Sequence, residues 1–111
     1  MQIFHLALAA DWAAAVEAGD YRVSTRGVTL EQEGYIHCSH ADQWRGVRDA
    51  FYADVTEPVL LLTIDTDRLA APVVEEEVPD ADRPFPHVYG PIDLDAVVEV
   101  RPLPGAGTRG Q

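Results

Sequence analysis

The sequence contains one cysteine, no lysine and no long apolar segment, and each of these absences excludes a class of protein. The single cysteine, Cys38, can form neither a disulfide within the chain nor a cysteine-rich zinc site. No apolar run approaches the roughly 20 residues that a membrane helix needs, so no membrane partner is expected. Residues 1–5 lack the basic region and apolar stretch of a signal peptide, and we therefore expect a cytoplasmic protein.

Positive charge is also scarce in this chain. All eight basic residues are arginines, they stand against 19 acidic residues, and the formal net charge is −11. Such a surface repels phosphate backbones, which bind through clustered Lys and Arg, so we do not expect extended nucleic-acid binding. Arginine does suit a fixed, bidentate contact with phosphate. A local contact with a small anionic ligand therefore stays open, and the sequence does not identify a protein partner.

What the sequence does contain is enough apolar material for one folded domain. Its 111 residues are 47% hydrophobic and 24% charged, which is ordinary globular composition. Patterns typical of strands and of helices both occur, and no linker or internal repeat separates them. We expect the fold class α+β, as a single small domain over residues 1–103. Residues 104–111 contain no core-forming residues and are expected to form a flexible tail.

Hydrophobic periodicity predicts the elements of this domain. Strands are expected at 2–8, 35–39, 58–64, 73–78 and 97–103, helices at 10–18 and 40–52, a helical turn at 28–33, and loops at 20–27 and 79–84. The run at 58–64 is almost continuously apolar, which favours a central strand. Ser39 and Asp42 have the spacing of a capping box at the start of the second helix.

The stretch 34–40, Gly-Tyr-Ile-His-Cys-Ser-His, is the most distinctive part of the chain. In an extended strand its side chains alternate between two faces. Tyr35, His37 and Ser39 then share a polar face that can line a cleft, while Cys38 points into the core as a small buried hydrophobic residue. His40 is expected at the surface, in the first turn of the following helix.

Two other segments carry histidines in strand-like surroundings. His5 lies within the apolar first strand, where it is either a buried histidine bonded to a backbone carbonyl or a group that projects towards a ligand. His87 lies in Phe-Pro-His-Val-Tyr-Gly-Pro, residues 85–91, whose prolines stiffen the backbone. His87 and Tyr89 lie on the same side if this segment is extended.

These residues permit several chemistries. No spacing fixes a third ligand beside His37 and His40, so we expect no metal. A cysteine nucleophile is disfavoured because Cys38 alternates away from His37, and no nucleophile-elbow sequence surrounds Ser39. The favoured interpretation is a cleft for a ribose-bearing or heteroaromatic ligand. Its expected lining comprises His5, His37, Ser39, His87 and Tyr89, with Arg22 or Arg26 nearby.

Three motifs in order resemble the bacterial domain of unknown function 952 family. Its members carry Ile-Tyr-His-Leu, Gly-Phe-Ile-His-Cys-Ser and Phe-Pro-His-Leu-Tyr-Gly-Pro. The matching segments here are residues 3–6, 34–39 and 85–91. The resemblance implies a fold similar to ADP-ribosyltransferases, with two small sheets, flanking helices and a cleft between the sheets. It places His5 where the ligand's ribose is held and Ser39 at the start of a helix. No residue matches the late-strand catalytic glutamate of those transferases.

The leading hypothesis is therefore that the protein binds NAD or an ADP-ribose-like nucleotide. Transferase or hydrolase activity on that ligand stays open. In this hypothesis His37 and His87 are the catalytic acid–base residues. The ligand-binding residues are His5, Arg22, Tyr35, Ser39 and Tyr89. Two alternatives stay open: a non-catalytic binding or interaction domain, and a metal-dependent hydrolase. Whether the chain is an enzyme is not decided by its sequence.

Overall fold

The computed structural model describes residues 1–79 and 81–104, which form one compact α+β domain with several small antiparallel sheets and three helices. The strands are β1 Gln2–Leu8, β2 Asp20–Tyr21, β3 Val23–Thr25, β4 Val28–Thr29, β5 Ile36–His37, β6 Val59–Asp65, β7 Val73–Glu76, β8 Phe85–Val88, β9 Ile92–Asp93 and β10 Val97–Leu103. The helices are α1 Ala9–Ala18, α2 Leu30–Glu33 and α3 Trp44–Phe51, and 3-10 turns cover Thr66–Arg68 and Leu94–Ala96. Apart from Pro104, the predicted tail lies outside the described residues.

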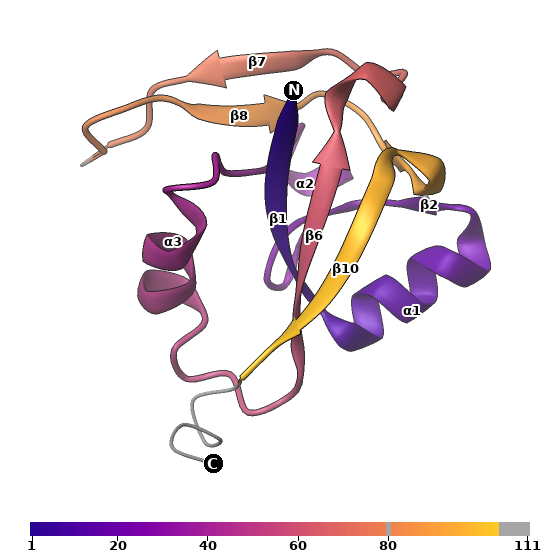
Figure 1. The fold of residues 1–111 in the computed structure, drawn as a ribbon, viewed down its shortest axis with the longest axis horizontal. Helices are drawn as coiled ribbons and strands as arrows, with labels where there is room; N and C mark the ends of the chain where they lie inside the picture. Colours follow the sequence, from indigo (N-terminus) through magenta and orange to yellow (C-terminus); the bar gives the residue numbers. More distant parts are fainter. Residues whose placement is uncertain (80, 105–111) are drawn as a thin grey trace.

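The longest strands form a sheet in the order β1-β6-β10, with both pairings antiparallel (Figure 1). The predicted central strand is confirmed, because β6 lies in the middle and pairs with β1 from Leu8↔Val59 to Gln2↔Asp65. In Figure 1 α3 lies to one side of this sheet and α1 to the other. No helix of the described residues is long and apolar enough to cross a membrane.

The remaining strands form three smaller sheets, where the sequence predicted one. The largest has the order β5-β8-β7, and β2-β9 and β3-β4 are two-stranded pairs. The prediction of a loop at 20–27 is therefore wrong: β2 and most of the β3–β4 hairpin lie there, and polar side chains on very short strands conceal the pattern. The predicted helical turn at 28–33 is confirmed in part, because α2 covers Leu30–Glu33 while residues 28 and 29 belong to β4; Gly34, with φ 97°, ends the helix before β5.

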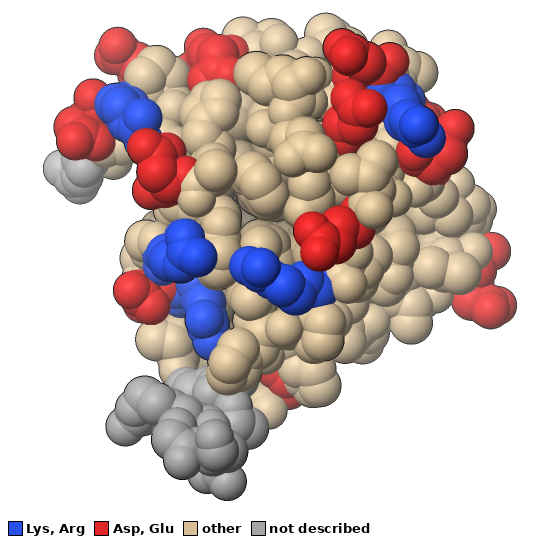
Figure 2. All heavy atoms as spheres, in the orientation of Figure 1, with Lys and Arg blue, Asp and Glu red and all other residues tan. Residues whose placement is uncertain are grey.

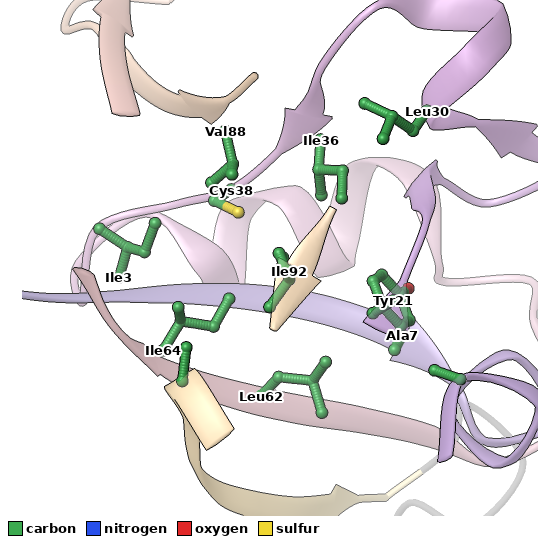
Figure 3. Close-up of a cluster of buried hydrophobic side chains, with 12 residues drawn as sticks. Ile3, Ala7, Tyr21, Leu30, Ile36, Cys38, Leu62, Ile64, Val88 and Ile92 are labelled. Atoms are coloured by element: carbon green, nitrogen blue, oxygen red, sulfur yellow. The ribbon is translucent and has the colours of Figure 1, made fainter. Parts of the chain in front are cut away.

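Alternating side chains divide the core into two clusters on opposite faces of the main sheet. On one face Ile3 and Ala7 of β1 pack with Leu62 and Ile64 of β6 (Figure 3). The same cluster takes in Tyr21, Leu30, Ile36, Cys38, Val88 and Ile92 from the smaller sheets and α2. On the other face Leu6, Val59 and Leu61 pack against Trp44 and Val47 of α3, together with Tyr52 and Val55.

Residues 36–39 join the main sheet to the β5-β8-β7 sheet. Ser39 exchanges two backbone hydrogen bonds with Phe4 of β1, at 2.8 and 2.7 Å. The Cys38 N–H donates to the carbonyl of Pro86 in β8 at 3.0 Å. The predicted capping box is wrong: α3 starts at Trp44, and the Gln43 side chain accepts from the His40 N–H instead. Ser39 is held in the sheet, one turn before the helix begins.

Cys38 is in the core, as predicted, and the structure makes its reactivity testable. The residue is 1% exposed, and burial raises the pKa of its thiol. We expect the folded protein to react with a thiol-specific disulfide reagent at neutral pH about 100-fold or more slowly than the unfolded protein. The measurement is absorbance after mixing, with the same protein in denaturant as control. Comparable rates in both states would place the thiol at the surface.

Candidate functional site

The candidate site is built on the pairing of β5 with β8. This antiparallel pairing sets His37 directly opposite His87, and such cross-strand neighbours lie within side-chain contact. The two rings meet, with His37 Nδ1 3.0 Å from His87 Nε2. His87 is almost fully buried and His37 is partly buried. Two of the three histidines that the sequence predicted to share one cleft are therefore in direct contact.

Glu76 of β7 holds the other side of His87. In the β7–β8 pairing Glu76 lies opposite Phe85, so His87, two residues further along β8, is its diagonal cross-strand neighbour. Glu76 Oε1 is 2.7 Å from His87 Nδ1 and 2.6 Å from the hydroxyl of Tyr89. The hydrogen bonds from Tyr89 and then His87 lower the pKa of the Glu76 carboxyl, so this group is a carboxylate that accepts both.

When both rings are neutral, this arrangement assigns their tautomers. A carboxylate only accepts hydrogen bonds, so His87 Nδ1 carries the proton and His87 Nε2 has the lone pair. His37 Nδ1 must then donate to His87 Nε2, which leaves the lone pair of His37 on Nε2. No described residue hydrogen-bonds to that nitrogen. Glu76, His87 and His37 thus form a relay in which His37 presents its unprotonated nitrogen.

Aromatic rings enclose the relay on the same sheet face. The ring of Tyr35 stacks on His87, with centroids 4.1 Å apart and planes 11° apart. Phe85 lies 5.0 Å from His37, and Tyr35 also contacts Tyr89 at 5.5 Å. These residues alternate along the two paired strands, as predicted for Tyr35 with His37 and for His87 with Tyr89. The stacking limits rotation of His87, which helps to keep its nitrogens aligned.

An open cavity of about 820 Å³ lies beside His37, between α3 and the hairpin of β7 and β8. Figure 2 shows the molecule hollowed between these two parts. The described lining of this cavity, which we call the pocket, consists of Ser24, Thr25, Glu33, Tyr35, His37, Asp42, Gln43, Gly46, Val47, Ala50, Phe51, Val78, Pro79, Ala81, Asp82, Arg83 and Phe85. The α3 wall is mainly apolar, whereas the β3 and β5 side is polar.

Charge in the pocket is mainly negative. Glu33, Asp42 and Asp82 are acidic, and Arg83 is the one basic residue in the described lining. Arg83 is 2.7 Å from Asp42, and this contact lowers the pKa of the Asp42 carboxyl. Burial and then the electrostatic interaction with His87 lower the pKa of His37 to about 4. His37 is therefore neutral at pH 7, and its second nitrogen can accept a hydrogen bond from a group in the pocket.

His5 lies beneath this site and does not line the pocket. Its Nδ1–H donates to the carbonyl of His37 at 2.7 Å, and its Nε2 accepts from the hydroxyl of Tyr21 at 2.9 Å. The residue is 3% exposed. Of the two interpretations open for His5, the buried histidine bonded to a backbone carbonyl is the one the structure shows. It supports the strand from which the His37 ring projects.

The other candidate residues are dispersed. Arg22 pairs with Asp20 and Glu31 at the surface, outside the pocket lining. Arg26 pairs with Asp54. Those arginines therefore do not clamp the pocket in this conformation.

Neither Ser39 nor Tyr89 lines the pocket: Ser39 is buried, and the Tyr89 hydroxyl donates to Glu76. His40 is partly exposed and pairs with Glu75, but its predicted place in the first turn of the helix is wrong, because α3 begins at Trp44. Whether any of these residues contacts a ligand stays a prediction. Among residues 1–79 and 81–104 no three His, Cys, Asp or Glu side chains converge to hold a metal ion, so the metal-hydrolase hypothesis has no ligand set there.

Glu76 is one of the residues that sequence reasoning missed. It lies in a run of three glutamates, 75–77, and only the register of β7 against β8 singles it out. Asp42 and Arg83 were missed for a similar reason, because they meet across 41 positions of sequence. The alternation of Glu76 within a strand beside a histidine-bearing strand was the available signal, and it does not reveal which strands pair.

Comparisons with known proteins agree with this fold. A family model described as "Protein of unknown function (DUF952)" matches residues 6–100. Protein CC0527 from Caulobacter crescentus has a similar crystal structure, with 22% identity, a TM-score of 0.79 and coverage of 93% of this chain and 86% of that one. Its solution NMR structure is also similar, with 22% identity, a TM-score of 0.70 and coverage of 89% of this chain and 81% of that one. This likeness shows the fold alone. No curated protein sequence matches the chain.

The relay predicts an NMR signature for the two histidines. We expect two-bond ¹H–¹⁵N spectra at pH 7 to show both His37 and His87 as Nδ1–H tautomers. Glu76→Gln should disturb this pattern, because the amide can turn its NH₂ towards His87 Nδ1. Tyr89→Phe is the matched control, since it removes a hydrogen bond from Glu76 and leaves the carboxylate in place. An Nε2–H tautomer of either ring in the unmodified protein would contradict the relay.

Buried His5 predicts acid sensitivity. Burial, partly offset by the bond to His37, lowers the pKa of His5 from 6.5 to about 4. As the pH falls, the unfolded chain therefore takes up the proton on His5 before the folded protein does, which favours unfolding. The contribution of neutral His5 to the free energy of unfolding is complete above pH 6.5 and is lost as pH falls to about 4. This loss is roughly 3 kcal/mol. Urea unfolding between pH 7.5 and 4.5 should show it, and His5→Gln should show a shallower pH dependence.

If His5→Gln does not fold, titration of the histidine ring protons by NMR gives the same information. The His5 signal should not titrate between pH 7.5 and 5 in the folded protein, whereas all histidines should titrate near pH 6.5 in urea. An ordinary titration of His5 in the folded state would overturn the assignment.

Proposed function

The chain belongs to the DUF952 family of proteins of unknown function, and from that premise we propose that it binds the ribose-bearing part of NAD or of an ADP-ribose-like nucleotide in the pocket and catalyses transfer or hydrolysis there. One observation carries the proposal: the relay of Glu76, His87 and His37 ends at the pocket wall with an unprotonated nitrogen. Side chains aligned in this way are typical of general bases.

The dimensions and lining of the pocket support a ligand of this size. A volume of about 820 Å³ lies within the range of small-molecule and cofactor sites. Phe51, Val47 and Phe85 offer apolar surface for a heterocyclic ring, and His37 lies at the polar end. A nucleoside has the same division, with an apolar ring at one end and hydroxyl groups at the other.

The charge of the pocket determines which part of a nucleotide it suits. Glu33 disfavours a phosphate near His37, and the neutral ring of His37 prefers a group that donates a hydrogen bond. A ribose hydroxyl meets both conditions. Phosphates would then lie towards Arg83, the lining residue with a guanidinium group, and would compete with Asp42 for it.

The chemistry follows from the orientation of His37. Its Nε2 takes the proton of a water or acceptor hydroxyl as that oxygen bonds to the C1′ carbon of the ribose. The C1′–nitrogen bond breaks, and its electron pair stays on the departing nicotinamide ring, which leaves neutral. The positive charge on His37 is then shared with His87 and balanced by Glu76. The likeness to ADP-ribosyltransferases is part of this proposal, and here the histidines stand in place of the late-strand glutamate.

A non-catalytic binding domain is the second candidate, and one observation favours it. Both nitrogens of His5 and both nitrogens of His87 are already bonded within the protein, as in purely structural histidines. On that reading the relay only stiffens the sheet. The two candidates differ in the role of His37, whose second nitrogen has no partner among the described residues.

A ligand titration of the His37→Gln variant tests the proposed function. We expect millimolar NAD and ADP-ribose to shift amide signals of Tyr35, His37 and Phe85 in two-dimensional NMR spectra. His37→Gln should weaken binding about tenfold or more, because it removes the acceptor nitrogen. His40→Gln is the matched control and should bind within about twofold, since His40 pairs with Glu75 outside the pocket.

Release of nicotinamide separates the two candidate functions. Catalysis predicts slow nicotinamide release from NAD that His37→Gln abolishes at unchanged melting temperature. Binding without release supports the non-catalytic candidate. Absence of any shift at the pocket at millimolar NAD and ADP-ribose would overturn the proposal of a nucleotide ligand.

A further inference from the structure

We propose that β10 is a docking edge for a second copy of this chain, and that the two β10 strands pair antiparallel about a two-fold axis at Val100. The inference goes beyond the proposed function, because the described lining of the pocket contains no residue of β10. Such a dimer joins two three-stranded sheets into one, in the order β1-β6-β10-β10-β6-β1. The support comes from the exposure of β10, the direction of its backbone groups and the order of its charges.

The outer edge of β10 is open. In the part of the chain that the structure describes, β6 is the one strand beside it (Figure 1). All residues from Val98 to Pro102 are exposed, although successive side chains of a strand point to opposite faces. The middle of β10 is therefore uncovered on both faces, and Val98 and Val100 are 45% and 39% exposed. An open edge with apolar side chains is a template for pairing with another strand.

The hydrogen bonds of β1 determine which backbone groups of β10 point outwards. Phe4 uses its N–H and its carbonyl for Ser39, so both groups point away from β6. Directions alternate in an antiparallel ladder, so Thr63, opposite Phe4, turns its own groups towards Glu99 of β10. Glu99 therefore bonds β6, whereas the next residue, Val100, turns its N–H and its carbonyl to the open edge.

Two features bound the segment that a second strand can use. From Val97 to Glu99 β10 advances two residues while β6 advances one, so Val98 is a bulged residue that interrupts the ladder. At the other end Pro102 has no N–H to donate, and by alternation its nitrogen is on the open side. The register left between them is centred on Val100, which exchanges two backbone bonds with Val100 of the second copy.

The charges on either side of Val100 are complementary to themselves. With Val100 opposite its own copy, Glu99 of each strand lies opposite Arg101 of the other, on the same face of the sheet. Facing side chains come closest at such non-hydrogen-bonded positions. Neither residue forms an ion pair within the described part of one chain. An axis moved by one residue sets Glu99 or Arg101 against its own copy, and like charges directly opposite are destabilising.

Exchange of these charges tests the register. Glu99→Arg sets two arginines opposite each other and Arg101→Glu sets two glutamates opposite each other, so each variant alone should dissociate about tenfold more readily than the unmodified chain. An equimolar mixture of the two variants restores both opposite-charge pairs and should associate as the unmodified chain does.

Analytical ultracentrifugation measures the association. Salt at about 0.15 M screens the repulsion between two chains that each have a net charge of −11. A short interface of this kind is weak, so the unmodified chain should be mainly monomeric at micromolar concentration and approach the mass of two chains at millimolar concentration.

Arg45→Glu is the matched control. The Arg45 guanidinium also lies over the ring of Trp44, at 4.3 Å from its centre against 5.7 Å for Arg101, but Arg45 belongs to α3. This variant should associate as the unmodified chain does, and an equal weakening would show a general charge effect and overturn the inference. A mass of one chain at every concentration, or a mixture that associates no better than either variant alone, would also overturn it. None of these measurements involves NAD, so the proposed function is tested separately.

Discussion

The architecture depends on the hydrogen bonding of residues 36–39, which belong to two sheets at once. At one end Ser39 is tied to β1 by a pair of backbone bonds, and at the other Ile36 and His37 pair with β8. Between them the carbonyl of His37 receives the Nδ1–H of buried His5. These bonds fix the β5-β8-β7 sheet against the main sheet, and a two-residue strand without them would be too short to hold a defined register.

Because that register is fixed, the two faces of the small sheet have separate tasks. The even positions, Ile36, Cys38 and Val88, fill the core, and their burial determines which way the odd positions point. The odd positions then carry the stacked rings and the two histidines. A shift of one residue would exchange the two sets and bury the relay in the apolar core. The site is thus aligned by the same packing that stabilises the domain.

The sequence was informative where its patterns are local. Alternation correctly assigned Cys38 to the core and grouped Tyr35 with His37, and the apolar run of β6 was central as predicted. It failed where the outcome depends on pairing. The short strands at 20–29 bury too few side chains to leave a period, and Glu76 acquires its partner only through the register of β7 on β8. Ser39 does not cap α3 as predicted, because its backbone pairs with β1 and the helix begins only at Trp44.

The number of histidines in the core does not distinguish a structural site from a functional one. The distinction depends on whether each ring nitrogen has a hydrogen-bond partner within the protein. His5 and His87 have both nitrogens paired, which is how buried imidazoles meet the cost of desolvation. His37 has one nitrogen paired, and no described residue bonds the other. His37 lines the pocket, and its second nitrogen is the physical reason for seeking a ligand there.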